Sequence, residues 1–134
     1  MSVGEKDLGK LCATLSPILG EAVYVYCSFA DFALPAGLTA FCTVREREGL
    51  TAVVERGEAV RLGLAYTYES RLITLSVHSS LEAVGFIALI SRKLAAACVP
   101  CNAVAGFYHD HILVPVDRAD EAMQLLNEIA SATC

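Results

Sequence analysis

The chain has 134 residues, of which 55% are hydrophobic, and a formal net charge of −5. A chain of this length makes one domain or two small ones. The high apolar content excludes an intrinsically disordered protein, and the acidic balance with scattered basic residues argues against a nucleic-acid partner.

The first half of the chain predicts two short helices and three strands. Leu8, Leu11 and Leu15 repeat at helical spacing, and Pro17 ends that helix because the residue before a proline avoids helical conformation. A polar link at 46–49 between two apolar runs indicates a hairpin. The expected elements are a helix at 6–15, strands at 22–29, 39–45 and 50–55, a loop at 30–38 and a helix at 57–64.

The second half predicts the order β-α-β-β-α. Ser79 and Glu82 have the spacing of a capping box, which makes Ser79 the expected N-cap of a long helix whose core stripe includes Ile90 and Leu94. Asp117 is the expected cap of the final helix. The expected elements are a strand at 71–77, a turn at 78–80, a helix at 81–97, a strand at 101–107, a turn at 108–110, a strand at 111–116 and a helix at 118–130.

This order is that of a ferredoxin-like α+β unit that lacks its last strand, with an antiparallel sheet and helices on one face. The first half holds spare strands, so we expect the two halves to share strands. The strand at 101–107 is apolar or small on both faces, whereas a sheet with one solvated face alternates more cleanly. We therefore expect the uncovered face to meet another sheet, and the chain to form a homo-oligomer, either a dimer or a tetramer.

The sequence points to a cytoplasmic protein without a membrane partner. No apolar core of signal-peptide length follows the N-terminus, and no apolar stretch approaches the ~20 residues of a membrane span. Among the six cysteines, Cys27 and Cys42 lie in apolar runs and are expected to pack in the core as free thiols. Cys98 and Cys101 form a C-x-x-C pair that follows a long helix instead of opening one, which argues against a redox site.

The three histidines are the candidates for a metal site. His109 and His111 point to the same side of an extended strand, whereas His78 is expected at the opposite end of the sheet. A metal site needs three or four converging ligands, and no second cluster completes one. We interpret 109–111 as a hairpin turn whose polar side chains bond backbone groups; a metal protein or a His-dependent enzyme is the alternative. No catalytic or nucleotide-binding motif occurs, so no catalytic residue and no cofactor are predicted.

The run 78–85 leads from a strand end into a helix N-terminus. Free backbone N–H groups and the helix dipole attract a carboxylate there, and Ser79 and Ser80 add hydroxyl groups. Gly85 costs about 1 kcal/mol inside a helix, which suggests a need for close backbone approach. The run is thus either an ordinary capped helix or a pocket for a small anion or amino acid.

Three stretches of sequence resemble a known family. The segment Leu75–Pro115 contains the runs S-V-H-S-S-L-E-A-V-G-F and C-N-A-V-A-G-F-Y-H-D-H-I-L-V-P, and residues 45–54 read R-E-R-E-G-L-T-A-V-V. They resemble the ACT-domain superfamily, in particular small bacterial tandem ACT-domain proteins of unassigned function. A more distant similarity is to aspartokinase regulatory domains and to the cytosolic arginine sensor of animal cells.

The resemblance implies a ferredoxin-like fold with two ACT units, an irregular one at 1–65 and a second at 66–134. It also implies amino-acid binding near the strand-to-helix turn, at an interface between units. The residues that it assigns to the ligand are His78, Ser79, Ser80, Leu81, Val84 and Gly85 from the turn, Asn102 and Ala103 from the following strand, and more weakly Glu48 and Thr51 from the other unit.

The resemblance and the turn together predict a non-catalytic sensor or regulatory module that binds an amino acid or a similar small carboxylate. Such a module would act on a separate protein partner. The alternatives are a ligand-free structural or oligomerisation module and, third, the metal protein or enzyme that uses His109 and His111.

Overall fold

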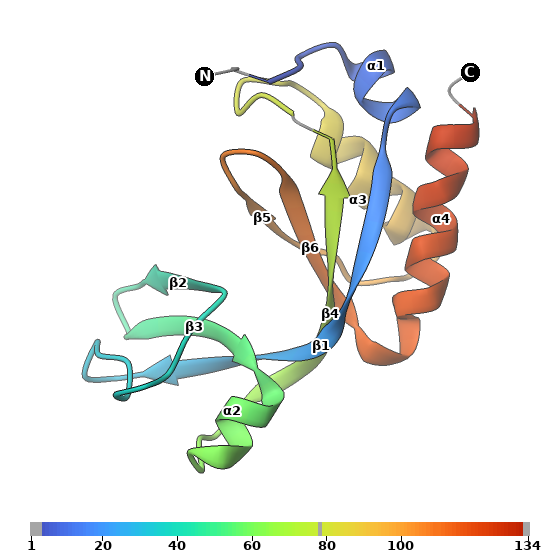
Figure 1. Ribbon diagram of the computed structural model, residues 1–134. Coiled ribbons are helices and arrows are strands. Elements are labelled where there is room, and N and C mark those ends of the chain that lie inside the picture. Colours follow the sequence, from blue (N-terminus) through green and yellow to red (C-terminus); the bar gives the residue numbers. More distant parts are fainter. Residues whose placement is uncertain (1–3, 78, 133–134) are drawn as a thin grey trace. The chain divides into compact units, whose positions relative to one another are not determined.

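The computed structural model describes residues 4–77 and 79–132 and confirms the α+β class (Figure 1). Helices and strands are mixed along the described residues. In chain order they are α1 (Leu8–Ala13), β1 (Ser16–Phe29), β2 (Cys42–Arg45), β3 (Leu50–Glu55), α2 (Arg56–Arg61), β4 (Thr67–Ser76), α3 (Phe86–Ala96), β5 (Asn102–Ala105), β6 (Asp110–Pro115), the 3₁₀ turn η1 (Val116–Arg118) and α4 (Ala119–Ala132).

The strands are hydrogen-bonded in the order β2-β3-β1-β4-β6-β5. The pairs β1 with β3, β2 with β3 and β5 with β6 are antiparallel. The chain forms two compact units, Met1–Gly20 with Arg71–Cys134, and Glu21–Ser70. The strands β1 and β4 each contribute to both units, as the expectation of shared strands requires. The division at residue 65 remains a prediction.

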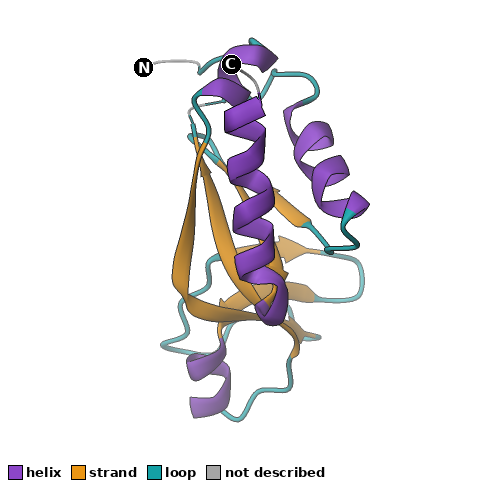
Figure 2. Ribbon diagram, turned by 90° about the vertical axis from the view of Figure 1, so that its right-hand side faces the viewer, coloured by secondary structure: helices purple, strands orange, loops and turns teal. Residues whose placement is uncertain are grey.

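The first unit, which carries both chain ends, is organised around one apolar core. Helices α3 and α4 cover one face of its strands (Figure 1, Figure 2). Ile90 and Leu94 of the predicted helix stripe are fully buried. They pack in a core with Ile73, Leu75, Ile112, Val114 and Leu126. The loops at the strand ends of this unit are thus attached to elements that share one apolar core.

The second unit has a smaller core, built around Val25, Cys27, Ala52, Val54 and Ala59. The predicted hairpin is present, because β2 and β3 pair directly. Cys27 is buried in this core as predicted, and burial raises the pKa of its thiol.

Two helix starts differ from the sequence prediction. The long helix begins at Phe86, and its N-cap is Gly85, which has a left-handed φ of 95° that favours glycine. The expected capping box at Ser79 is therefore wrong. Asp117 lies inside η1, and α4 begins two residues later, so Asp117 is not its cap.

The strand β1 also begins earlier than predicted, at Ser16. Pro17 is tolerated there because a proline can occupy the start of a strand. None of the helices in the described part of the chain is long and apolar enough to span a membrane.

Candidate functional site

A pocket of about 230 Å³ lies in the first unit, where β4 leads into α3. Serine hydroxyls, one carboxylate and small apolar side chains surround it. Its lining residues are Ser79, Ser80, Leu81, Ala83, Gly85, Phe86, Ile87, Ala88, Ala105 and Asp110. Five of them, Ser79, Ser80, Leu81, Ala83 and Gly85, belong to the run 78–85 that the sequence singles out.

A buried polar contact fixes the turn to the neighbouring strand β6. The Ser79 hydroxyl donates a hydrogen bond to Oδ2 of Asp110, at 3.1 Å. Both residues are nearly inaccessible, with 6% and 9% of their surface exposed. A carboxylate in such a place requires hydrogen-bond partners, because an isolated buried charge is costly. Ser79 supplies one partner, and the remaining lone pairs of Asp110 can accept further donors.

The N-terminus of α3 also lines the pocket. The first three residues of this helix, Phe86, Ile87 and Ala88, all line the pocket. The first N–H groups of an α-helix have no acceptor within the helix, and the helix dipole makes this end attractive to anions. The N-cap Gly85 has no side chain that could occupy those donors.

The pocket therefore combines two opposite electrostatic features. The start of α3 offers N–H donors and a partial positive charge, and Asp110 offers a negative one. A ligand that carries both a carboxylate and an ammonium group matches this arrangement. Leu81, Ala83 and Ala105 provide apolar surface for the rest of such a ligand.

The two described histidines bond to groups of the adjacent strand. His109 Nδ1 lies 3.2 Å from the carbonyl oxygen of Val77, and His111 Nδ1 lies 3.1 Å from Oγ1 of Thr74. Burial is the main cause that lowers the pKa of His111, followed by the charge of His109, whereas Asp110 raises it. Over residues 4–77 and 79–132, no group of three or more His, Cys, Asp or Glu side chains could hold a metal ion.

Comparison with known protein families identifies the chain. Residues 3–71 match one family model described as an ACT domain, and residues 67–128 match a second model with the same description. The chain belongs to the ACT-domain family. ACT domains are regulatory domains, and this ACT protein carries two of them in tandem, as the resemblance implies.

Several solved structures share the fold of this ACT protein. A protein of unknown function from Vibrio cholerae, described as a possible transport protein, is 41% identical, with a TM-score of 0.81, and the match covers 93% of this chain and 97% of that one. The regulatory subunit of aspartate kinase from Thermus thermophilus is 7% identical, with a TM-score of 0.63 and coverages of 88% and 97%. A putative C-terminal regulatory domain of aspartate kinase from Porphyromonas gingivalis is 11% identical, with a TM-score of 0.61 and coverages of 88% and 98%. A comparison with curated proteins gives no match.

Not all residues predicted for the ACT ligand site line the pocket. Val84 belongs to the turn but is 85% exposed and does not line it. Asn102 and Ala103 lie in β5, yet it is Ala105 of that strand that reaches the pocket. Their roles in binding remain predictions.

Glu48 and Thr51 lie outside the pocket of the first unit. Thr51 belongs to the second unit, where its hydroxyl donates to the Glu46 carboxylate, and Glu48 belongs to that unit as well. His78 lies outside the described residues. The roles of these three residues in binding also remain predictions.

The sequence prediction missed Asp110, whose carboxylate lines the pocket. The residue was assigned to a hairpin turn, but β6 begins at Asp110 and the residue is buried. His78, which was expected at the opposite end of the sheet from the His-Asp-His run, lies outside the described residues, but the residues on either side of it lie beside that run. Val77 and Ser79 both contact that run. The sequence signal that could have singled out Asp110 is its position as an acidic residue just before the apolar run Ile112–Val114.

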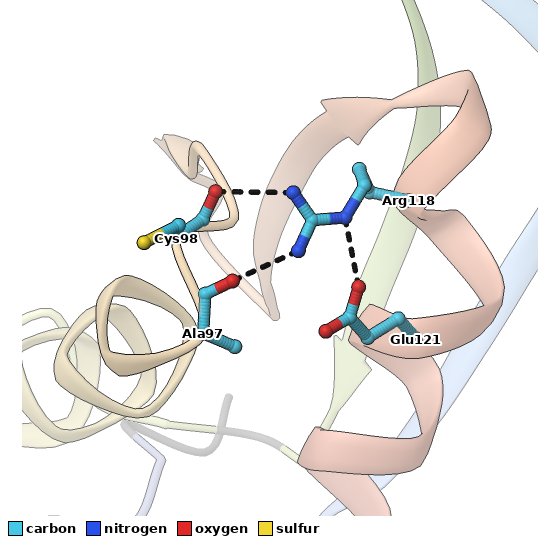
Figure 3. A network of polar contacts seen from close by, with 4 residues as sticks. All are labelled: Ala97, Cys98, Arg118 and Glu121. Carbon is cyan, nitrogen blue, oxygen red and sulfur yellow. Dashed lines mark hydrogen bonds and ion pairs between the residues drawn. The ribbon is translucent and has the colours of Figure 1, made fainter.

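A polar network closes the other end of α3, away from the pocket. Arg118 donates hydrogen bonds to the carbonyl oxygens of Ala97, at 2.8 Å, and Cys98, at 3.2 Å, and pairs with Glu121 at 2.8 Å (Figure 3). Cys98 directly follows the C-cap of this helix. The first cysteine of the C-x-x-C pair thus lies at the C-terminal end of a helix and not at its start, as the sequence predicts. Burial raises the pKa of the Cys101 thiol.

Proposed function

We propose that this protein is a non-catalytic regulatory module that binds an amino acid, or a similar small carboxylate, in the pocket between the Ser79–Gly85 turn and Asp110. The observation that carries the proposal is the placement of a buried carboxylate and the start of α3 around one small pocket. Membership of the ACT-domain family supports it, because ACT domains are regulatory domains.

The size and the lining of the pocket favour a small zwitterion. A volume of about 230 Å³ is below the ~300–1,000 Å³ typical of sites for drug-sized ligands. In the proposed complex, the ligand carboxylate accepts N–H groups at the start of α3, and the ligand ammonium donates to Asp110. Ser79 and Ser80 orient the turn. The Ser79 hydroxyl donates to Asp110, and the Ser80 hydroxyl accepts the N–H of Glu82 at 3.1 Å.

A thermal-shift and calorimetry screen of the twenty amino acids tests this proposal. We expect at least one of them to raise the melting temperature at millimolar concentration. The double variant Ser79→Ala, Ser80→Ala should weaken that binding. The matched control changes two exposed serines outside the pocket, Ser16→Ala and Ser28→Ala, and should bind as the unchanged protein does. A folded protein that responds to no amino acid would overturn the proposal.

We also propose that the module associates with itself and that the ligand acts on a separate protein partner. Large apolar side chains remain on the surface of each unit, and Ile18, Val60 and Leu81 are all more than half exposed. Sedimentation at micromolar concentration should show a species heavier than 14.3 kDa. A stable monomer would contradict self-association. The regulated partner would then be sought with the monomer.

A ligand-free structural module is the competing function. It predicts an oligomer that is indifferent to every amino acid in the screen. We place the protein in the cytoplasm in either case. The five cysteines in the described part of the chain are free thiols, which suits a reducing compartment.

A further inference from the structure

The pocket turn is attached to the beginning of the chain by backbone hydrogen bonding. The N–H of Ser80 donates to the carbonyl oxygen of Glu5, at 2.9 Å. Glu5 and Ser79 form an isolated parallel β-bridge. Figure 1 shows the segment before α1 running beside the loop that follows β4. Two residues that line the pocket, Ser79 and Ser80, are therefore held from outside by the segment Gly4–Asp7.

The same segment also forms an ion pair with the turn, and its far end is connected to the core through α1. Lys6 Nζ lies 2.8 Å from Oε2 of Glu82, and this contact lowers the pKa of the Glu82 carboxyl. Oε2 of Glu5 accepts the N–H groups of Lys6 and Asp7, each at 3.0 Å. Asp7 caps α1 by accepting the N–H of Lys10. Because α1 inserts Leu11 into the core, the segment has a fixed point at its far end.

Gly4 shows how closely the segment approaches the turn. A Cβ atom at this position would lie 2.8 Å from the Ser80 nitrogen and 2.9 Å from the Ser79 carbonyl carbon. Gly4 also has a φ of +84°, in the left-handed region that favours glycine. Any other residue here would move the segment away from the pocket turn.

We propose that Gly4–Asp7 is an N-terminal strap that fixes the pocket turn and is thereby coupled to ligand binding. This inference rests on the proposed function for its ligand, but the attachment of the strap to the turn can be measured without one. A turn already held in place loses less conformational freedom when a ligand binds, so the strap should raise affinity. Because coupling between two events is reciprocal, a bound ligand should in turn tighten the strap.

This coupling gives the module a way to report on its ligand. A strap that is held more firmly when the pocket is filled changes the surface at the start of the chain. A protein partner that binds the released strap, or the exposed pocket turn beneath it, would then distinguish the filled module from the empty one.

The test compares two glycine substitutions in the full chain. Gly4→Ala should displace the strap. Gly57→Ala makes the same chemical change in α2, where an added Cβ meets nothing within 4 Å, and serves as the control. The readout is the amide hydrogen exchange of Ser80, followed by NMR. Loss of the bond to Glu5 should speed that exchange about tenfold in Gly4→Ala, and the control should match the unchanged protein.

A charge swap provides a second and milder test. Lys6→Glu places two carboxylates together and should also speed the exchange of Ser80. Adding Glu82→Lys restores an opposite-charge pair and should slow the exchange again. Arg47→Glu makes the same change of charge in the second unit and should have no effect.

The coupling is tested with an equimolar mixture of the twenty amino acids at millimolar concentration. In the unchanged protein the mixture should slow the amide exchange of Ser80 and of Asp7. In Gly4→Ala, the concentration of the mixture that gives half of the maximal slowing should be about tenfold higher. Ser80 exchange that is equal in Gly4→Ala and Gly57→Ala would overturn the strap, as would an equal response of both variants to the mixture. If the mixture changes nothing in the unchanged protein, the proposed function fails, and the exchange rates without ligand still decide for or against the strap.

Discussion

Replacing Asp110 by asparagine should separate binding from stability at the pocket. The carboxylate accepts the Ser79 hydroxyl at 3.1 Å and is 9% exposed. Asparagine has nearly the same shape and keeps an oxygen acceptor for that hydroxyl. It removes the negative charge that the proposed ligand ammonium needs. We therefore expect a folded protein that binds its amino acid poorly.

The expected loss of ligand affinity is larger than the expected change in the free energy of unfolding, so the two effects can be measured separately. A hydrogen bond to a charged group contributes about 1.5–3 kcal/mol, so affinity should fall about 10- to 150-fold in Asp110→Asn. Replacing the charged acceptor of the Ser79 hydroxyl by a neutral amide oxygen should change the free energy of unfolding by about 1 kcal/mol or less. For a chain of 134 residues, that corresponds to a shift in melting temperature of about 4 °C at most.

Asp110→Ala is the contrasting variant. It leaves the Ser79 hydroxyl, which is 6% exposed, without its acceptor. An unsatisfied buried group costs about 1–3 kcal/mol, so the melting temperature should fall by about 4–11 °C. Calorimetric titration gives the affinities, and thermal unfolding gives the stabilities. Affinity that is unchanged in Asp110→Asn would refute the assignment of the ammonium to this carboxylate.

Three further changes test the stability of the first unit. Arg118→Ala should lower the urea midpoint of unfolding, because two carbonyl groups at the end of α3 lose their donors, whereas Arg92→Ala, on the exposed side of that helix, should leave it nearly unchanged. Cys98 has a φ of 59°; Cys98→Gly should therefore raise the free energy of unfolding by about 0.5–1 kcal/mol, while Cys98→Ala should not. His111 has a pKa below its ordinary value of 6.5, so the folded state binds protons less readily than the unfolded state, and stability should fall as the pH drops from about 7 to about 5. In His111→Gln this loss should be smaller at the same two pH values, and an equal loss would contradict the assignment.

The sequence predicted the elements whose pattern is set by local spacing. The strand Leu50–Glu55 has its predicted bounds, and Ile90 and Leu94 are buried at the positions that the helical stripe assigns to them. The start of α3 was not predictable in this way. The apolar run continues through Leu81 and Val84 at helical spacing, and only the left-handed backbone of Gly85 shows that these residues precede the helix. A glycine in a sequence is compatible with either conformation.

For the site, too, the residues that are close in sequence were predicted, and the residue that is distant in sequence was not. The turn residues Ser79 and Ser80 were predicted because they adjoin a helix start in sequence. Asp110 is 31 residues from Ser79 and reaches it only because β4 lies beside β6 in the sheet, with β5 outside them. The sequence gives the order of strands along the chain, whereas the site depends on their order in space. For this reason the 109–111 run was expected far from the end of β4, although Val77 and Ser79 both contact it.

Analogues of a bound amino acid would show whether both ends of the pocket take part. An acid without its ammonium group still meets the N–H donors of α3, but it brings a second negative charge toward Asp110. An amine without its carboxylate keeps Asp110 and leaves the helix donors unused. Each analogue loses one charged contact of about 1.5–3 kcal/mol, so each should bind about 10- to 150-fold more weakly than the amino acid. For valine the analogues are isovalerate and isobutylamine, and calorimetric competition measures both. If isovalerate bound as tightly as valine, the pocket would be a site for simple carboxylates and Asp110 would have only a structural role. If isobutylamine did so, the start of α3 would have no part in recognition.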